Sequence, residues 1–127
     1  MLLYEDKTEL IIKCFYKVYN SLGYGFLEKV YENALIIELK KEGLHCLQQM
    51  PVKVFYEEAE VGLYFSDIIV DNAVILELKA GDGEIIKEYE SQLQNYLKAT
   101  EYEVGLVLHV GVKPSFKRKI FTKRALR

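Results

Sequence analysis

Three ionisable residues, Asp67, Glu77 and Lys79, interrupt two apolar runs in the middle of the chain. Two carboxylates that lie close together repel each other, and a divalent cation between them removes that conflict. Oxygen ligands without a nearby Cys or His point to Mg²⁺ or Mn²⁺ rather than zinc. A lysine close to Glu77 could orient a water molecule or stabilise charge on a phosphoryl oxygen. The alternative is a salt bridge between Lys79 and an acid on an exposed sheet face.

The two apolar runs predict a β-hairpin with strands at residues 61–70 and 73–79. A two-residue turn at Asp71-Asn72 would send Asp67 and Glu77 to opposite faces and remove the metal site. A three-residue loop over residues 71–73, or one bulge, would pair them instead. We favour this second register because it places every charge on one face. The other face is then wholly apolar and consists of Ile68, Val70, Val74, Leu76 and Leu78.

Apolar residues at spacings of three and four predict helices over residues 7–19, 26–42 and 84–99. Asp6 or Thr8 is expected to cap the first helix, and Gly43 to occupy the C-terminal cap position of the second. Glu28 and Glu32 lie one turn apart on the second helix and are expected to form a solvated flank. The core stripe of this helix is expected to contain Leu27, Val30, Tyr31, Ala34 and Ile37.

The third helix carries Tyr89, Gln92 and Tyr96 at spacings of three and four. This polar and aromatic face could hold a substrate strand or support the metal ligands, and the alternative is ordinary core packing. Further strands are expected around residues 52–56 and 105–110, and a short strand or helix at 116–121. The order α-α-β-β-β-α-β predicts an α/β or α+β sheet flanked by helices, with the third helix as the crossover between two parallel strands.

Length and composition indicate one domain over residues 1–127. The apolar runs are too short to cross a bilayer, and the N-terminus is acidic where a signal peptide would be basic, so we expect a soluble, cytoplasmic protein. Seven of the 17 Lys and Arg residues follow Gly111, whereas no acid follows Glu103. This tail is either solvated or a phosphate-contacting patch. The residues expected to contact nucleic acid are Lys113, Lys117, Arg118 and Lys119.

Three motifs resemble a known family. Asp67 followed by Glu77-Leu78-Lys79 resembles the D…(D/E)xK signature of the PD-(D/E)XK nuclease superfamily, with Ser66 at the position of the nominal proline. The segment from Gln92 to Tyr96 resembles the QxxxY motif of exonuclease-like branches. The segment from Gly25 to Tyr31 matches the GxxExxY motif that names a small family within this superfamily.

The resemblance implies a restriction-endonuclease-like mixed sheet in which the charged face of the hairpin meets the second helix. It implies that Asp67, Glu77, the Leu78 carbonyl and Glu28 hold Mg²⁺ or Mn²⁺. Lys79 would serve the attacking water, and Gln92 and Tyr96 would position it. These roles suit in-line hydrolysis of a phosphodiester.

The expected function is therefore that of a Mg²⁺-dependent nuclease acting on DNA or RNA. The alternative is a binding or regulatory module that retains the nuclease fold and needs a partner for activity. Exposed apolar surface on so small a fold would favour a homodimer.

Overall fold

The computed structural model describes residues 3–83, 85 and 87–122, so the basic residues Lys123, Arg124 and Arg127 lie outside the described part of the chain. The helices are α1 (Glu5–Leu22), α2 (Glu28–Lys41) and α3 (Lys87–Ala99). The strands are β1 (Cys46–Tyr56), β2 (Ala59–Val70), β3 (Val74–Ala80), β4 (Val104–Val110) and β5 (Pro114–Ile120). The predicted order of elements is confirmed, and the last element is a strand.

The five strands form one mixed sheet in the order β1-β2-β3-β4-β5. Strands β3 and β4 are parallel, and every other neighbouring pair is antiparallel. The connection between the two parallel strands runs through α3, as a parallel pair requires. The prediction of an α+β sheet with a crossover helix is therefore confirmed.

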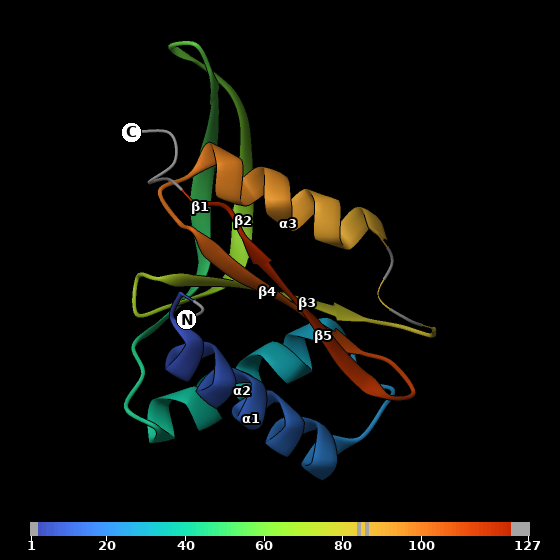
Figure 1. The fold of residues 1–127 in the computed structure, drawn as a ribbon. Helices are drawn as coiled ribbons and strands as arrows, with labels where there is room; N and C mark the ends of the chain where they lie inside the picture. The colour runs from blue at the N-terminus through green and yellow to red at the C-terminus, as the bar shows by residue number, and fades with distance from the viewer. Residues whose placement is uncertain (1–2, 84, 86, 123–127) are drawn as a thin grey trace.

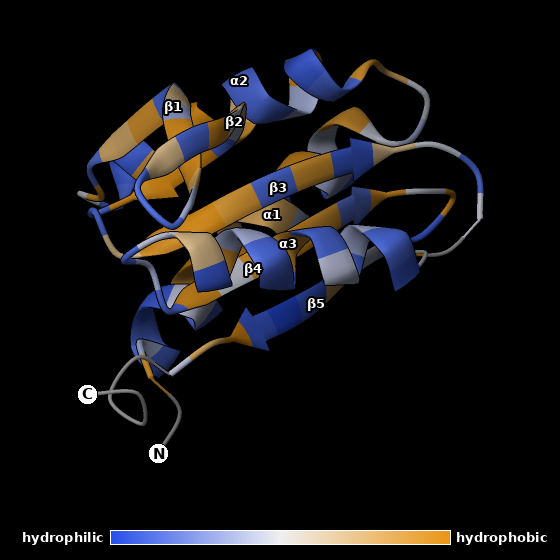
Figure 2. Cartoon of the chain, turned by 90° about the horizontal axis from the view of Figure 1, so that it is seen from above, coloured by the Kyte–Doolittle hydropathy of each residue, from blue (hydrophilic) through white to orange (hydrophobic). Residues whose placement is uncertain are grey.

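The helices divide between the two faces of the sheet (Figure 1). α1 and α2 cover one face, where Phe15, Leu35 and Leu106 belong to the larger core cluster. α3 covers the other face, and its Leu93 and Leu97 pack in a second cluster with side chains of β2, β3 and β4. Because both faces are covered, β3 and β4 are largely apolar, as Figure 2 shows. Within the described residues, the helices lack the length and apolarity that a membrane span requires.

The loop between β2 and β3 has three residues. Asp71 and Asn72 both have φ of 51°, in the left-handed region that Asp and Asn tolerate. Pairing resumes with Val70 opposite Val74 and continues to Ile68 opposite Leu76. The favoured register is confirmed, because this pairing places Asp67 and Glu77 on one face and the predicted apolar set on the other.

The prediction of which face of α2 is buried is wrong. Leu27 is the N-cap residue and is 80% exposed, and Val30 and Ile37 are also exposed. The helix buries a face made of Tyr31, Glu32, Leu35, Ile36 and Leu39. Apolar side chains surround most of this helix, so periodicity alone does not identify the face that contacts the sheet.

The helix ends follow the predictions in part. Gly43 adopts φ of 81° just after α2, and its N–H donates to Lys40 while that of Leu44 donates to Leu39. This pattern is a Schellman motif, as expected from the glycine. The predicted capping of α1 is wrong, because its N-cap is Tyr4 without a side-chain cap and the Thr8 hydroxyl donates to the Glu5 carbonyl instead.

The β1–β2 hairpin extends beyond the rest of the sheet (Figure 1). One face of it turns inward, since Val52 is buried and Tyr64 stacks against Tyr96 of α3. The opposite face is exposed to solvent. Its exposed apolar residues on β2 alternate along the strand and are Val61, Leu63 and Phe65.

Replacing Gly105 by alanine should destabilise the fold by about 1–3 kcal/mol, because overpacked cores shift side chains and backbone. A Cβ at Gly105 would lie 2.8 Å from Cδ1 and 3.1 Å from Cγ of Leu93, which is fully buried. Denaturant unfolding measures the effect. The control is Gly62→Ala, where the added atom would lie 3.7 Å from Val54. Equal losses of stability in the two variants would contradict this account of the α3–β4 contact.

Candidate active site

The end of the β2–β3 pair brings the two hairpin carboxylates together. The last residues paired between β2 and β3 are Ile68 and Leu76. Asp67, which precedes Ile68 on β2, accepts the N–H of Leu78 through its Oδ2 at 2.7 Å. The side chain of Asp67 thus replaces a main-chain acceptor where the two strands separate. Asp67 is half-buried, and Glu77 is only 8% exposed.

The environment of Glu77 disfavours its charge. Burial first, and then the neighbouring carboxylate of Asp67, raise the pKa of Glu77 to about 9, and Lys79 opposes this shift. Its Oε1 is buried and has no hydrogen-bond partner among the described residues. A buried carboxylate oxygen without a donor, next to a second carboxylate, fits a divalent cation that prefers oxygen ligands.

Glu28 does not complete a preformed three-carboxylate cluster. Its Oε2 accepts the N–H of Ala80 at 3.0 Å, at the end of β3. It lines a pocket of about 610 Å³ together with Asp67, but Glu77 is not part of the lining. In the described part of the chain, no three Asp, Glu, His or Cys side chains are close enough together to hold a metal ion. Asp67 is therefore close to both of the other expected side-chain ligands in different ways. It lines a pocket with Glu28, and it lies with Glu77 at the end of the β2–β3 strand pair.

Lys79 lies on the same sheet face as Glu77. Its Nζ is 5.1 Å from the centre of the Tyr89 ring, at the start of α3, which is a cation–π geometry. The ammonium itself lies over the ring, and Lys79 as a whole is half-buried. Lys79 is thereby positioned by α3 as well as by β3.

Only part of the polar and aromatic face expected on α3 lies near Asp67 and Glu77. Tyr96 stacks on Tyr64 with ring centres 3.5 Å apart, and burial together with Glu77 and Asp67 raises the pKa of its hydroxyl. The stack places Tyr96 within electrostatic reach of both carboxylates. Gln92 is exposed on the same helix, whose buried residues are Leu93 and Leu97.

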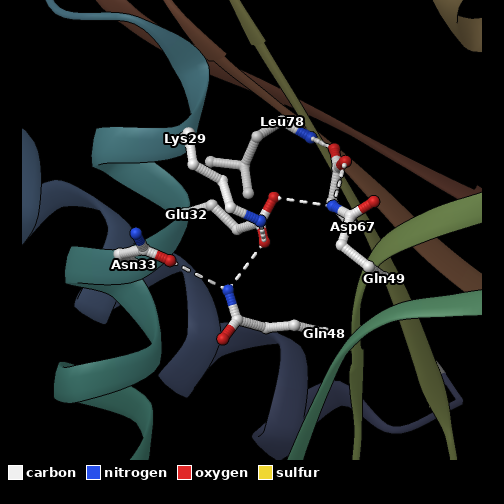
Figure 3. Close-up of polar contacts among 7 residues, drawn as sticks. All are labelled: Lys29, Glu32, Asn33, Gln48, Gln49, Asp67 and Leu78. Carbon is white, nitrogen blue, oxygen red and sulfur yellow. Dashed lines mark hydrogen bonds and ion pairs between the residues drawn. The ribbon is translucent and has the colours of Figure 1, made fainter.

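Glu32 is a site residue that the sequence pattern missed. The predicted solvated flank is wrong here, because Glu32 is only 4% exposed. Its carboxylate accepts hydrogen bonds from Gln48, Gln49 and Lys29 (Figure 3). No local signal marks this residue, because the apolar residues of α2 favour neither face and its donors Gln48 and Gln49 lie on β1.

The segment before α2 is anchored by Tyr31. The Tyr31 hydroxyl donates to the carbonyl of Gly23 and accepts the N–H of Phe26 at 3.1 Å. These contacts hold the loop that forms one wall of the pocket containing Glu28 and Asp67. The last residue of the Gly25–Tyr31 motif therefore has a structural role in shaping this wall.

Replacing Tyr31 by phenylalanine should reduce stability by about 1–2 kcal/mol, because the hydroxyl is lost while the buried ring is kept. Denaturant unfolding measures the loss, and Tyr16→Phe on α1 is the matched control. Hydrogen exchange should rise at the amide of Phe26 before the core exchanges. Unchanged protection at Phe26 would contradict the anchoring role.

The expected nucleic-acid contacts on β5 have different environments. Lys119 forms an ion pair with Glu90 at 2.7 Å, and the Arg118 guanidinium donates to the carbonyl of Leu3. Lys113 and Lys117 are exposed. Strand β4 separates β5 from β3, so this basic edge lies two strands from Glu77. The exposed pair is the better placed for contact with phosphate.

His109 lies next to Lys79 in the β3–β4 ladder. It is buried, and its Nδ1 has no hydrogen-bond partner among the described residues. Burial lowers its pKa, and the carboxylate of Glu28 opposes this shift. At neutral pH it therefore adds no full positive charge beside Lys79.

Comparisons with known proteins identify the family of the chain and a similar fold. A family model of the PD-(D/E)XK nuclease superfamily matches residues 5–120. The crystal structure of SSO0001 is similar, with a TM-score of 0.55 at 16% sequence identity, and the match covers 97% of this chain and 63% of that chain. At this identity the likeness concerns the fold alone, and this chain spans less than two thirds of that structure's length. No curated protein matches the sequence.

Proposed function

We propose that this chain, which belongs to the PD-(D/E)XK nuclease superfamily, is a Mg²⁺-dependent nuclease that hydrolyses phosphodiester bonds in nucleic acid, with DNA as the first substrate to test. The observation that carries the proposal is the pair formed by Asp67 and Glu77. The pair occupies one face at the end of two strands, and Glu77 has a buried oxygen to which no described residue donates. Lys79 follows on the same face.

The residues that would hold Mg²⁺ or Mn²⁺ are Asp67, Glu77 and the carbonyl of Leu78, with Glu28 from the pocket wall. When bound, such an ion supplies Lewis-acid polarisation of a phosphoryl oxygen and compensates the charge of the two carboxylates. The buried Oε1 of Glu77, which has no partner among the described residues, favours this role over a purely structural salt bridge with Lys79.

The remaining groups act on the water and the phosphate. Lys79, held over Tyr89, orients the attacking water and stabilises negative charge on a phosphoryl oxygen. Tyr96 positions the substrate beside the carboxylates, and exposed Gln92 on the same helix contacts the incoming strand. Lys113 and Lys117 add phosphate contacts at the far edge, with smaller contributions from Arg118 and Lys119, which have partners within the protein.

The test is a cleavage assay with Mg²⁺ or Mn²⁺ on single-stranded, duplex and branched DNA and on RNA. Wild-type protein is expected to cleave at least one substrate, and the Asp67→Ala variant none. Intact substrates in both cases would overturn the catalytic proposal.

A second candidate is a module that retains the fold and the metal but needs a partner for activity. The observation in its favour is that Glu28, Asp67 and Glu77 do not form one three-carboxylate group in the described chain. Calorimetric titration with Mg²⁺ separates the two candidates. Binding that is lost in Glu77→Gln, without any cleavage by wild type, favours the module.

The finer assignments belong to the same proposal. Membership of the GxxExxY branch is proposed from the segment between Gly25 and Tyr31. A homodimer is proposed from the exposed apolar face of the β1–β2 hairpin that carries Leu63 and Phe65. A cytoplasmic location is proposed together with the nucleic-acid substrate.

A further inference from the structure

We infer that Glu32 is a positioning residue that acts through Gln49 on Asp67, so that a buried carboxylate on α2 fixes the orientation of the metal-binding aspartate. The inference rests on the proposed function of Asp67. Nothing in the sequence motifs assigns a role to Glu32 or to Gln49.

The amide group of Gln49 lies between the two carboxylates (Figure 3). Its Nε2 is 3.0 Å from Oε1 of Glu32 and 3.4 Å from Oδ1 of Asp67. Ionised carboxylates only accept hydrogen bonds, and a primary amide has two N–H groups to give. The two N–H groups of Gln49 therefore bridge the two acids, with one donated to each.

Glu32 is itself held in place from two elements. Its Oε2 accepts from Nε2 of Gln48 at 2.7 Å and from Nζ of Lys29 at 3.0 Å. Lys29 belongs to α2 and Gln48 to β1, so the buried carboxylate links the helix to the edge strand. A charged group that is only 4% exposed requires such partners. The position of Glu32 is thus fixed independently of Asp67.

The backbone of β1 is distorted at the bridging residue. Successive side chains of a regular strand point to opposite faces, yet Gln48 and Gln49 both donate to Glu32. The reason is that Gln49 has φ of 52°, an uncommon conformation for a residue other than glycine. Pairing continues on both sides of it, with Gln48 opposite Ile68 and Met50 opposite Ser66. Such local strain is typical of functional sites whose surroundings hold it in place.

The consequence for Asp67 is a fixed carboxylate plane. Oδ2 accepts the N–H of Leu78 and Oδ1 accepts from Gln49, which leaves the remaining lone pairs in a defined direction. Hydrogen bonds that orient a ligating carboxylate are worth about 10–100-fold in metal affinity or activity. Loss of the bridge should weaken metal binding without removing a ligand.

Calorimetric titration with Mg²⁺ alone tests this role. Gln49→Met keeps the length of an exposed side chain and removes the bridge, and Glu32→Gln removes its anchor. Each is expected to weaken Mg²⁺ binding by about 10–100-fold. Lys53→Met is the control, because Lys53 lies on the same strand and pairs with Glu60 instead, so its Mg²⁺ affinity should stay near that of wild type.

A double-mutant cycle separates positioning from simple structural support. If Glu32 acts through Gln49, adding Glu32→Gln to Gln49→Met should cause no further loss of Mg²⁺ affinity. Additive losses, or wild-type affinity in Gln49→Met, would overturn the inference. Magnesium binding with this pattern but without cleavage would overturn only the nuclease proposal, and a wild-type protein that binds no Mg²⁺ would overturn both.

A metal-free readout uses the side-chain amide signals of Gln49 in NMR spectra. These signals should shift in both Glu32→Gln and Asp67→Asn, because each variant changes one acceptor of the bridge. The side-chain signals of Gln94, which donates to the carbonyl of Ile120, serve as the internal reference. Gln49 signals that stay unchanged in both variants would refute the bridge, whatever the activity of the protein.

Discussion

Replacing Lys79 by methionine is expected to lower the rate of phosphodiester hydrolysis by about 10²- to 10⁴-fold, the range typical of a positioned group that acts on water or transferred protons. Methionine keeps an unbranched side chain and removes the ammonium that lies over the ring of Tyr89. The fold should therefore be retained while the charge beside Glu77 is lost. Steady-state cleavage assays at saturating Mg²⁺ measure the change.

The matched control for this variant is Lys53→Met. Lys53 lies on β1 and forms an exposed ion pair with Glu60 at 3.6 Å, on the projecting hairpin. Its loss should leave the rate nearly unchanged, because exposed pairs contribute little. Equal losses of activity in both variants would mean that Lys79 acts only through general surface charge.

Replacing Glu77 by glutamine is expected to remove most of the pH dependence of stability in the metal-free protein. The pKa of Glu77 is raised from 4.5 to about 9 in the folded state, so the stability it contributes is complete below about pH 4.5 and is lost as the pH rises through 9. The wild-type free energy of unfolding should fall by on the order of 1.4 kcal/mol per pH unit across this window.

At pH 7 the glutamine variant should consequently be more stable than wild type by on the order of 3 kcal/mol without metal. Urea unfolding at several pH values, in the presence of a chelator, measures both curves. Parallel curves for the two proteins would show that Glu77 is not desolvated in the folded state.

Added Mg²⁺ should narrow this difference in stability, because it stabilises wild type and not the variant. A ligand that binds only the folded state at about 100 times its Kd stabilises by about 2.7 kcal/mol. Wild-type protein should therefore gain stability with Mg²⁺ at pH 8, and Glu77→Gln should gain little. The control is Glu90→Gln, where the acid lies on α3 and pairs with Lys119 instead.

The hairpin register shows how far sequence reasoning reaches. Alternation along residues 61–79 required Asp67 and Glu77 to share a face if the apolar side chains were to form one core. Asp71 and Asn72 also suit a two-residue turn, and the N–H of Ala73 does donate to Val70 as in such a turn. The burial pattern decided between these turns, because a one-residue slip would have exposed the whole apolar set.

The face of α2 was beyond the reach of the same reasoning. Val30 and Ile37 are as apolar as Leu35 and Leu39, so the sequence carried no preference between the two stripes. On the observed face, the carboxylate of Glu32 finds two donors on β1, Gln48 and Gln49, in addition to Lys29 on its own helix. Partners so distant in sequence leave no local pattern.

The Gln49 bridge could not have been predicted for a related reason. A left-handed glutamine within a strand contradicts the ordinary preference of the residue, and tertiary contacts override that preference. Glu28, by contrast, was placed by its motif near Asp67, and the two do line one pocket. Motifs thus located the pocket, while the hydrogen bonds that orient its acids became visible only in three dimensions.

The most direct measurement is a crystal structure of the protein grown with millimolar Mn²⁺, whose anomalous scattering identifies the ion. The central claim is that Asp67 and Glu77 together form a divalent-metal site. It predicts an anomalous peak within coordination distance of both carboxylates, one oxygen being the now unpaired Oε1 of Glu77. Crystals without a peak between these two residues, or with one only on the basic edge or elsewhere on the surface, would contradict it.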